Sequence, residues 1–466
     1  MRFSPFGNNI FRFHLYIPVF FSKIDTEKYM LPLFGREETI MAKNTSIHYR
    51  NQVMYSIYVR NYSEAGSFEA VRRDLGRIKN LGVDVIWLMP IHPCGVKNRK
   101  GSLGSPYAIS DYRAVNPEFG TLEDLKALVQ DIHDLGMKCI IDVVYNHTAP
   151  DSVLAQTHPE WFYHRADGSF GNRIGDWYDV IDLDYSNKAL WDYQIETLKY
   201  WAQLVDGFRC DVAPLVPLEF WLRAREAVEE VRPGCLWLSE SIEPGFITYT
   251  RSIGLGALSD GEVYQAFDLC YDYDIFHHFL NYLKGEIPLS RYAEAVNSQE
   301  FIYPENYVKL RYLENHDNNR AAQLIPNDKA LRNHTALQYF QKGMMLLYAG
   351  QEVCATHTPG LFNKDTVNWN TGKDLTELLQ KLYAVKKHPL MANGAYTLRA
   401  YAHDIALAYY EKDGRRLVGV FSLRGETGLL GVDLPDGRYE NLLDGGIVEI
   451  RAGRLGCSGE PVIFEV

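Results

Sequence analysis

The sequence predicts an α/β protein that folds as a (β/α)8 TIM barrel, and three observations support this fold class. Eight short apolar segments alternate with segments whose apolar residues recur at helical spacing. No Gly-rich phosphate-binding turn follows the first strand, which disfavours the alternative, a doubly wound open sheet. The third observation is the number of these units, because eight strands close a parallel barrel. The expected strands are residues 54–60, 83–90, 138–144, 206–213, 236–241, 265–271, 308–315 and 344–351.

The segments between the strands have the start and stop signals of helices. Residues 67–82 begin with Ser67 and end in Leu-Gly, and residues 121–136 begin with Thr121 and end in the same pair. Ser and Thr are favoured N-cap residues, and Gly is favoured just beyond the last helical turn. We therefore expect a helix after each of the first two strands, with similar helices in the later gaps.

Two regions depart from this alternation. The gap after the third strand is polar and aromatic, which predicts a small loop domain over residues 148–187, on the face where barrel enzymes keep their active sites. Residues 391–466 contain the turn sequences EKDGRR, LPDGRY and LLDGG between short alternating segments. They predict a β-sandwich-like C-terminal domain. The catalytic barrel then occupies residues 41–390.

Residues 1–40 are expected to lie outside the fold, as a disordered or non-native leader. Their apolar segment, residues 10–21, contains Arg12, His14 and Pro18. It is too short to span a bilayer and makes a poor signal-peptide core. A secretion or anchor signal is the alternative interpretation.

The composition restricts the partners and the compartment. The formal net charge is -11, which argues against nucleic acid or an anionic membrane surface as a partner and favours a neutral or cationic small substrate. The seven cysteines are scattered, odd in number and mostly within apolar segments. This pattern indicates reduced thiols and a cytoplasmic protein. Nothing in the sequence indicates the oligomeric state.

Charged residues interrupt the fourth strand, where Arg209 and Asp211 share one face and Cys210 and Val212 should point outward to the helices. Polar residues also end the third, fifth and seventh strands. Independent helix caps would not concentrate carboxylates in this way, so the set predicts an active site at one end of the barrel. The full set is Asp142, Asn146, His147, Arg209, Asp211, Glu240, Glu314, Asn315, His316 and Asp317.

Converging carboxylates without a Cys/His metal set suggest acid–base and nucleophilic chemistry on a glycosidic bond. One carboxyl group must be ionised, and Arg209 on the same strand face should keep Asp211 in that form. The other must carry a proton, and the apolar strand around Glu240 should favour its neutral form.

Four motifs at these strand ends, DVVYNH (142–147), GFRCD (207–211), LSES (238–241) and LENHD (313–317), resemble the ordered motifs of the α-amylase family, glycoside hydrolase family 13. Two further segments are similar to the family's sequences between strands two and three and at the end of its loop domain. These are residues 105–121 and 180–187. The resemblance runs from about residue 50 to 390 and points to a member with a short loop domain.

The resemblance implies a retaining, double-displacement mechanism. In it Asp211 is the nucleophile, Glu240 the general acid and then base, and Asp317 the stabiliser of the transition state. The sugar-binding residues that it implies are Tyr107, Asp142, His147, Arg209, His316 and Arg320. Asn146 and Asp182 match the family's calcium ligands. The chemistry itself requires no cofactor.

The chain departs from the family pattern just after the nucleophile. Many relatives carry Lys-His where this chain has Pro214 and Leu215, which puts both the leaving-group contacts and the calcium site in question. The expected substrates are maltodextrins or related α-glucans. Linkage preference, chain length and endo or exo action stay open. The alternatives are a transglycosylase of the same family and a catalytically inactive carbohydrate-binding or ancillary subunit.

Overall fold

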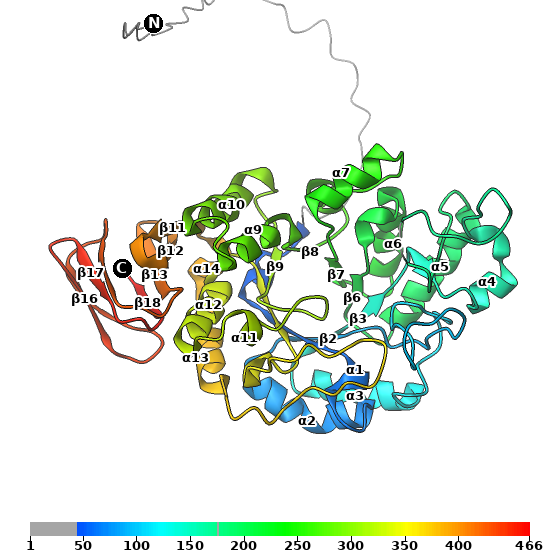
Figure 1. Cartoon of the computed structure of the whole chain (residues 1–466), viewed down its shortest axis with the longest axis horizontal. Helices are drawn as coiled ribbons and strands as arrows, with labels where there is room; N and C mark the ends of the chain where they lie inside the picture. Colours follow the sequence, from blue (N-terminus) through cyan, green and yellow to red (C-terminus); the bar gives the residue numbers. More distant parts are fainter. Residues whose placement is uncertain (1–43, 175–176) are drawn as a thin grey trace, which may run out of the picture. The chain divides into compact units, whose positions relative to one another are not determined.

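The computed structural model describes residues 44–174 and 177–466, so the expectation for residues 1–40 lies outside the described residues. Eight parallel strands form a closed barrel in the order β1-β10-β9-β8-β7-β6-β3-β2, with helices around it (Figure 1). The predicted fold class is confirmed. The barrel strands are β1 (Val53–Ile57), β2 (Val85–Leu88), β3 (Lys138–Val143), β6 (Gly207–Cys210), β7 (Leu236–Ser239), β8 (Leu269–Tyr271), β9 (Lys309–Arg311) and β10 (Met344–Tyr348).

The helices of the barrel form where the apolar spacing predicts them. Ser67 caps α2 by accepting a hydrogen bond from the backbone N–H of Ala70, and Thr121 forms a capping box with Asp124 at the start of α3. The helices are α1 (Val59–Tyr62), α2 (Phe68–Asn80), α3 (Leu122–Asp134), α4 (Val153–Thr157), α5 (Lys188–Ala202), α6 (Leu218–Glu229), α7 (Pro244–Ser252), α8 (Asp260–Val263), α9 (Tyr273–Leu283), α10 (Leu289–Ile302), α11 (Ala321–Leu324), α12 (Asp328–Phe340), α13 (Thr376–Lys386) and α14 (Pro389–Asn393).

The strand β6 packs tightly against its neighbour at its first residue. A Cβ atom on Gly207 would lie 2.3 Å from the backbone carbonyl oxygen of Leu236, so the close approach of β6 and β7 requires glycine here. The register of these strands pairs Asp142 of β3 with Arg209 of β6, and Arg209 with Leu238 of β7. The packing therefore brings three consecutive strand ends to one level of the barrel.

A small excursion leaves the barrel after β3. Its two-residue strands, β4 (His147–Thr148) and β5 (Ile181–Asp182), pair antiparallel and hold the ends of the excursion together. His147 therefore lies opposite Asp182 in a short ladder. This pairing fixes the excursion above the end of β3 where the polar strand-end residues lie.

The C-terminal segment forms two four-stranded antiparallel sheets that enclose a separate apolar cluster (Figure 1). Their strand orders are β11-β12-β13-β18 and β14-β17-β16-β15. The bounds are β11 (Ala395–Tyr401), β12 (Ile405–Lys412), β13 (Arg415–Ser422), β14 (Gly428–Gly431), β15 (Gly437–Glu440), β16 (Ile447–Arg451), β17 (Arg454–Cys457) and β18 (Val462–Glu465). The predicted all-β character of this segment is confirmed.

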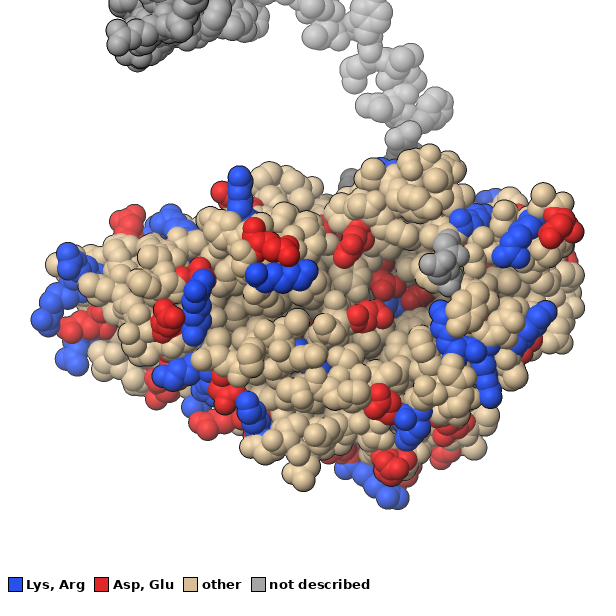
Figure 2. Space-filling view, viewed as in Figure 1, with Lys and Arg blue, Asp and Glu red and all other residues tan. Residues whose placement is uncertain are grey.

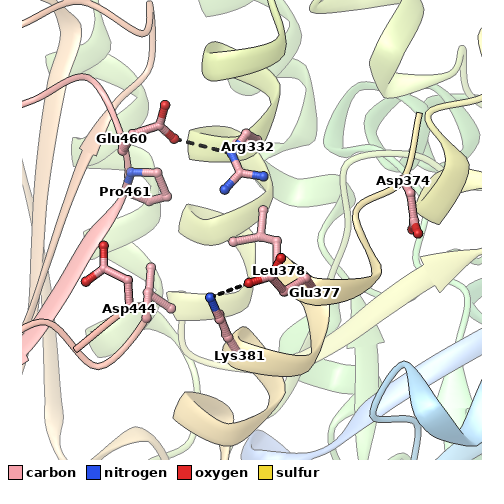
Figure 3. Close-up of a pocket in the computed structure, with 9 residues that line it drawn as sticks. Arg332, Asp374, Glu377, Leu378, Lys381, Asp444, Glu460 and Pro461 are labelled. Atoms are coloured by element: carbon pink, nitrogen blue, oxygen red, sulfur yellow. Dashed lines mark hydrogen bonds and ion pairs between the residues drawn. The ribbon is translucent and has the colours of Figure 1, made fainter. Parts of the chain in front are cut away.

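A cavity of about 310 Å³ lies between α12, α13 and the C-terminal strands (Figure 3). Four of its charged groups form two pairs: Arg332 lies 3.3 Å from Glu460, and Lys381 lies 2.7 Å from Glu377. The first pair links α12 to the C-terminal segment, and the second lies within α13.

Two further observations concern the described residues as a whole. None of their helices is both long enough and apolar enough to cross a membrane. All seven cysteines are free thiols, and every one except the partly buried Cys94 is buried.

Candidate active site

Arg209 is the centre of the predicted site. Its side chain is fully buried at the end of β6, and its Nη1 donates to Oδ1 of Asp142 at 2.9 Å and to Oδ1 of Asp211 at 2.8 Å. Its Nη2 lies 2.9 Å from Oε2 of Glu240, in an ion pair rather than an aligned hydrogen bond. One guanidinium group therefore joins the ends of β3, β6 and β7. On the face shown in Figure 2, acidic side chains gather near the middle, over this part of the barrel.

The turn after β6 corrects one sequence expectation. The strand ends at Cys210, and Val212 lies beyond it in the left-handed region, with φ 36° and ψ 41°, instead of facing the helices from within a strand. This conformation is rare for a β-branched residue and indicates a backbone held by its surroundings. The turn points the N–H of Val212 at Glu240, where it donates to Oε2 at 2.7 Å.

Burial controls the protonation of this cluster. Loss of solvent raises the pKa of Glu240 well above its usual range, and the charges of Asp211 and Asp317 act in the same direction, while Arg209 opposes them. Burial also raises the pKa of Asp142. The structure thus gives Glu240 the environment of a protonated acid, as its apolar strand predicts.

Tyr107 and His316 close the site opposite β6. Tyr107 Oη lies 2.7 Å from His316 Nε2 and donates to Asp142 Oδ2 at 3.3 Å. The two rings are stacked, with their centroids 5.5 Å apart. Burial lowers the pKa of His316, so this imidazole is neutral near pH 7.

The remaining predicted residues of the site lie at its opening. His147 Nε2 is 4.0 Å from Asp211 Oδ2. Asp317 follows β9, its side chain is 43% exposed, and its Oδ2 lies 3.1 Å from His316 Nε2. The structure therefore brings together the three predicted catalytic carboxylates and five of the six predicted sugar-binding residues. The five are Tyr107, Asp142, His147, Arg209 and His316.

Arg320 has a different environment. Its side chain is fully buried, and Nη1 donates to Oε1 of Glu314 at 2.6 Å. Nη2 and Nε donate to the backbone carbonyls of Ala349 and His357. Protein groups thus engage every nitrogen of this guanidinium, which in this structure braces the end of β9 rather than facing the opening.

Asn146 and Asp182 line one cleft of about 570 Å³, next to Pro214, Leu215 and Arg173. Asp182 Oδ1 is buried without a hydrogen-bond partner among the described residues, which would suit a cation. Calcium, however, takes six to eight oxygen ligands.

The rest of this cleft does not supply such a set. Within residues 44–174 and 177–466, no group of three or more His, Cys, Asp and Glu side chains could hold a metal ion. Pro214 and Leu215 contribute no side-chain oxygen, and the cationic Arg173 donates to the carbonyl oxygen of Leu183 at 3.1 Å. These residues alone do not fit a calcium site.

Sequence reasoning missed two aromatic residues beneath the site. The guanidinium carbon of Arg209 lies 5.3 Å from the ring centre of Trp87 and 5.5 Å from that of Tyr271. Tyr271 Oη also accepts from Arg209 Nε at 3.3 Å. Both residues lie in apolar strands, where an aromatic ring is expected in any core, and only the position of Tyr271 at a strand end gave a signal.

Comparisons with known proteins agree with this geometry. The family "Alpha amylase, catalytic domain" matches residues 52–178 and 158–390, and "Bacterial Alpha amylase C-terminal domain" matches residues 397–464. The chain belongs to the α-amylase family. Its catalytic-domain match includes all eight barrel strands and every residue that Arg209 contacts.

Solved structures of relatives share the whole architecture. An α-amylase from Lactobacillus plantarum is 50% identical, with a TM-score of 0.88, and the match covers 90% of this chain and 100% of that one. A maltogenic α-amylase from Thermotoga neapolitana is 32% identical, with a TM-score of 0.79, over 90% and 99% of the two chains.

Curated relatives are more distant and longer. An α-1,4-glucan:maltose-1-phosphate maltosyltransferase from Picrophilus torridus is 25% identical over 82% of this chain, and an α-amylase from Haloarcula japonica is 26% identical over 84%. The chain spans about six tenths of the length of these two relatives, 62% and 59%.

Proposed function

We propose that the protein is a retaining α-glycoside hydrolase that cleaves the glucosidic bonds of maltodextrins or related α-glucans. The observation that carries this proposal is the shared contact of Asp211 and Glu240 with Arg209, at 2.8 Å and 2.9 Å. The shared guanidinium holds the two carboxyl groups near each other, and in retaining enzymes the two groups are only about 5–5.5 Å apart, with no water between them.

The proposed reaction has two steps. Asp211 attacks the anomeric carbon and forms a glycosyl ester, while Glu240 gives its proton to the leaving oxygen. Glu240 then takes a proton from water as the water attacks the same carbon and releases Asp211. Both interactions of Glu240 use Oε2, which leaves Oε1 available for this proton transfer.

The other residues at the opening would bind the sugar. Asp317 is the most exposed of the carboxylates, so it can bond two ring hydroxyls and favour the charge of the transition state. His147 and His316 offer further hydrogen bonds to the same ring. Arg320 would act indirectly, by holding Glu314 beneath this end of β9.

A transglycosylase is the second candidate. It shares the first step and differs only in transferring the glycosyl group to a sugar instead of water. The name of the Picrophilus relative, a maltosyltransferase, favours this candidate. An inactive binding subunit is disfavoured, since all three carboxylates are present and in contact with the residues that this chemistry requires.

The proposal includes no metal ion in the chemistry. Structural calcium at Asn146 and Asp182 is tested by melting and assaying the protein in excess EDTA. Equal melting temperature and activity with and without EDTA would show that the protein does not need calcium. A decrease of either in EDTA would support a bound calcium ion.

The net charge of -11 suits a neutral glucan, and the free thiols suit a cytoplasmic location. The substrate is tested by chromatography of the products from maltotriose, isomaltose, pullulan and starch. Shorter products without any longer ones indicate hydrolysis, and products longer than the substrate indicate transfer. Absence of both on every α-glucan would contradict the proposed function.

A further inference from the structure

The strand β8 supplies no acid or base to the proposed reaction, yet it ends beside Arg209. Tyr271, its last residue, is fully buried, and its hydroxyl oxygen accepts a hydrogen bond from Arg209 Nε at 3.3 Å. The other nitrogens of this guanidinium contact carboxylates. Among the described residues that accept a hydrogen bond from Arg209, Tyr271 is therefore the neutral one.

A second tyrosine lies two residues further on. Tyr273 begins α9, and its ring centre is 5.2 Å from that of Tyr271. Its hydroxyl oxygen accepts from Asn315 Nδ2 at 3.3 Å, and Asn315 Oδ1 in turn accepts from the backbone N–H of Asp317 at 2.9 Å. Through Asn315, Tyr273 thus contacts the loop that carries Asp317.

We propose that Tyr271 and Tyr273 are positioning residues of the active site, Tyr271 orienting Arg209 against Asp211 and Glu240, and Tyr273 orienting Asp317 through Asn315. The inference rests on the proposed function. It assigns to β8 the task of aligning the two sides of the site, the Arg209 side and the Asp317 side, relative to each other.

The chemistry of a phenol suits this task. A planar guanidinium can rotate about its side-chain bonds unless its Nε is held as well as its two outer nitrogens. A carboxylate at position 271 would add a fourth carboxyl group to a cluster that already has three for one cation. Burial raises the pKa of Tyr271 well above its usual range, so its hydroxyl stays neutral while it accepts the bond.

The backbone of β8 is itself held in place. The carbonyl oxygen of Tyr271 accepts from Lys309 Nζ at 3.2 Å and from Ser241 Oγ at 3.4 Å. Ser241 is the residue after Glu240. These two hydrogen bonds fix the end of β8 relative to β9 and to the segment that carries Glu240.

The chain also offers a matched control. Tyr312, just after β9, is buried, and its ring centre lies 6.0 Å from that of Tyr271 and 6.2 Å from that of Tyr273. Its hydroxyl has no hydrogen-bond partner among the described residues. Removal of this hydroxyl changes the same aromatic cluster without changing either proposed contact.

The test compares Tyr271→Phe, Tyr273→Phe and Tyr312→Phe by kcat, KM, melting temperature and the pH profile of kcat/KM on maltotriose. We expect about a tenfold decrease in kcat for Tyr271→Phe with a change in KM under about threefold, as for an interaction that acts in the transition state. Its alkaline limb should move to higher pH. Glu240 faces Arg209, Asp211 and Asp317, and a looser Arg209 opposes the two negative charges less.

For Tyr273→Phe we expect a similar decrease in kcat/KM without a shift of the alkaline limb, since Asn315 and Asp317 lie on the other side of the site. Tyr312→Phe should match the wild type in every kinetic measurement. If Tyr271→Phe and Tyr273→Phe had the kinetics and pH profile of Tyr312→Phe, the inference would be overturned, whatever their melting temperatures.

Failure of the inference is distinguishable from failure of the proposed function. An inactive Asp211→Asn together with wild-type kinetics in both tyrosine variants would overturn only the role of β8. An active Asp211→Asn would overturn the proposed function, and the inference with it.

Discussion

The barrel buries two ionic clusters that differ in how their charges are compensated. The first, the Arg209 cluster, joins Arg209 to Asp142, Asp211 and Glu240. The second, the Lys309 cluster, lies along β8 and β9 and joins Lys309 and Arg311 to three aspartates. Lys309 contacts Asp260 and Asp274, and Arg311 contacts Asp272. The first cluster has one cation for three carboxylates, and the second has two.

Neutral donors reach both clusters, and in the Arg209 cluster they are the Tyr107 hydroxyl and the N–H of Val212. In the Lys309 cluster, Gln299 Nε2 donates to Asp272 and Asp274, and Tyr303 Oη donates to Asp274 as well. Burial raises the pKa of Asp260 and Asp272 in this cluster. It would raise that of Asp274 as well, but Lys309 and these donors bring the pKa of Asp274 below its usual value. Glu240 in the Arg209 cluster shifts the opposite way.

Buried charge therefore has two uses in this barrel, one structural and one chemical. Where a cation and neutral donors outweigh the effect of burial, as at Asp274, the carboxylate stays ionised and helps to hold strands together. Where negative charge is in excess and one side is open, a carboxyl group keeps a proton that it can transfer. The excess at the Arg209 cluster favours chemistry over stability.

The largest expected effect is loss of activity when the Arg209 cluster loses a reacting carboxyl group. Asp211→Asn and Glu240→Gln should each lower kcat on maltotriose by at least about 10³-fold. The melting temperature should stay equal or rise, because Asp211→Asn removes a negative charge from a crowded group and Glu240→Gln replaces a protonated carboxyl group with a neutral amide of the same shape. A variant that kept near-normal turnover would refute the role given to that residue.

The Lys309 cluster should respond in the opposite way. Lys309→Met leaves two buried aspartates without their cation, so we expect the free energy of unfolding to fall by about 3–5 kcal/mol. Denaturant titration measures this, with Lys381→Met, at a half-exposed lysine on α13, as a control that should change little. Equal stability of the two variants would show that the buried pairs are not structural.

The pH dependence should separate the clusters further. Glu240 has a raised pKa and must be protonated to act, so kcat/KM should fall as pH rises through that raised value, above the usual range for glutamate. In the same window the folded state binds more protons than the unfolded state, so stability also falls with rising pH. Glu240→Gln should flatten this part of the stability curve. A stability curve identical to that of the wild type would contradict the assignment.

The sequence predicted the strands well because each is an apolar segment between helical ones. Their ends were less predictable. The strand expected at 265–271 begins only at Leu269, as β8. The strand expected at 206–213 ends at Cys210. In the second case the reason is a hydrogen bond from Val212 to Glu240, a contact 28 residues away that no local pattern reveals.

The site was predictable to the extent that its residues are charged. Carboxylates at strand ends stand out in apolar segments, so Asp211, Glu240 and Asp317 could be found. Tyr271 could not, because its partner Arg209 is 62 residues away and a buried tyrosine resembles any core residue. The resemblance implied that Arg320 binds the sugar, and its pairing with Glu314, six residues earlier, depends on the turn between them, which no local pattern reveals.

The most direct test of the central claim is to trap the glycosyl–enzyme. A 5-fluoroglucosyl fluoride should react with the protein because its leaving group needs little acid assistance, and the Glu240→Gln variant should then retain the sugar. Mass spectrometry of the digested protein should locate one fluoroglucosyl group on the peptide that contains Asp211. A label on another carboxylate would contradict the proposed mechanism. So would rapid release of fluoride with no label on the wild type or on the Glu240→Gln variant.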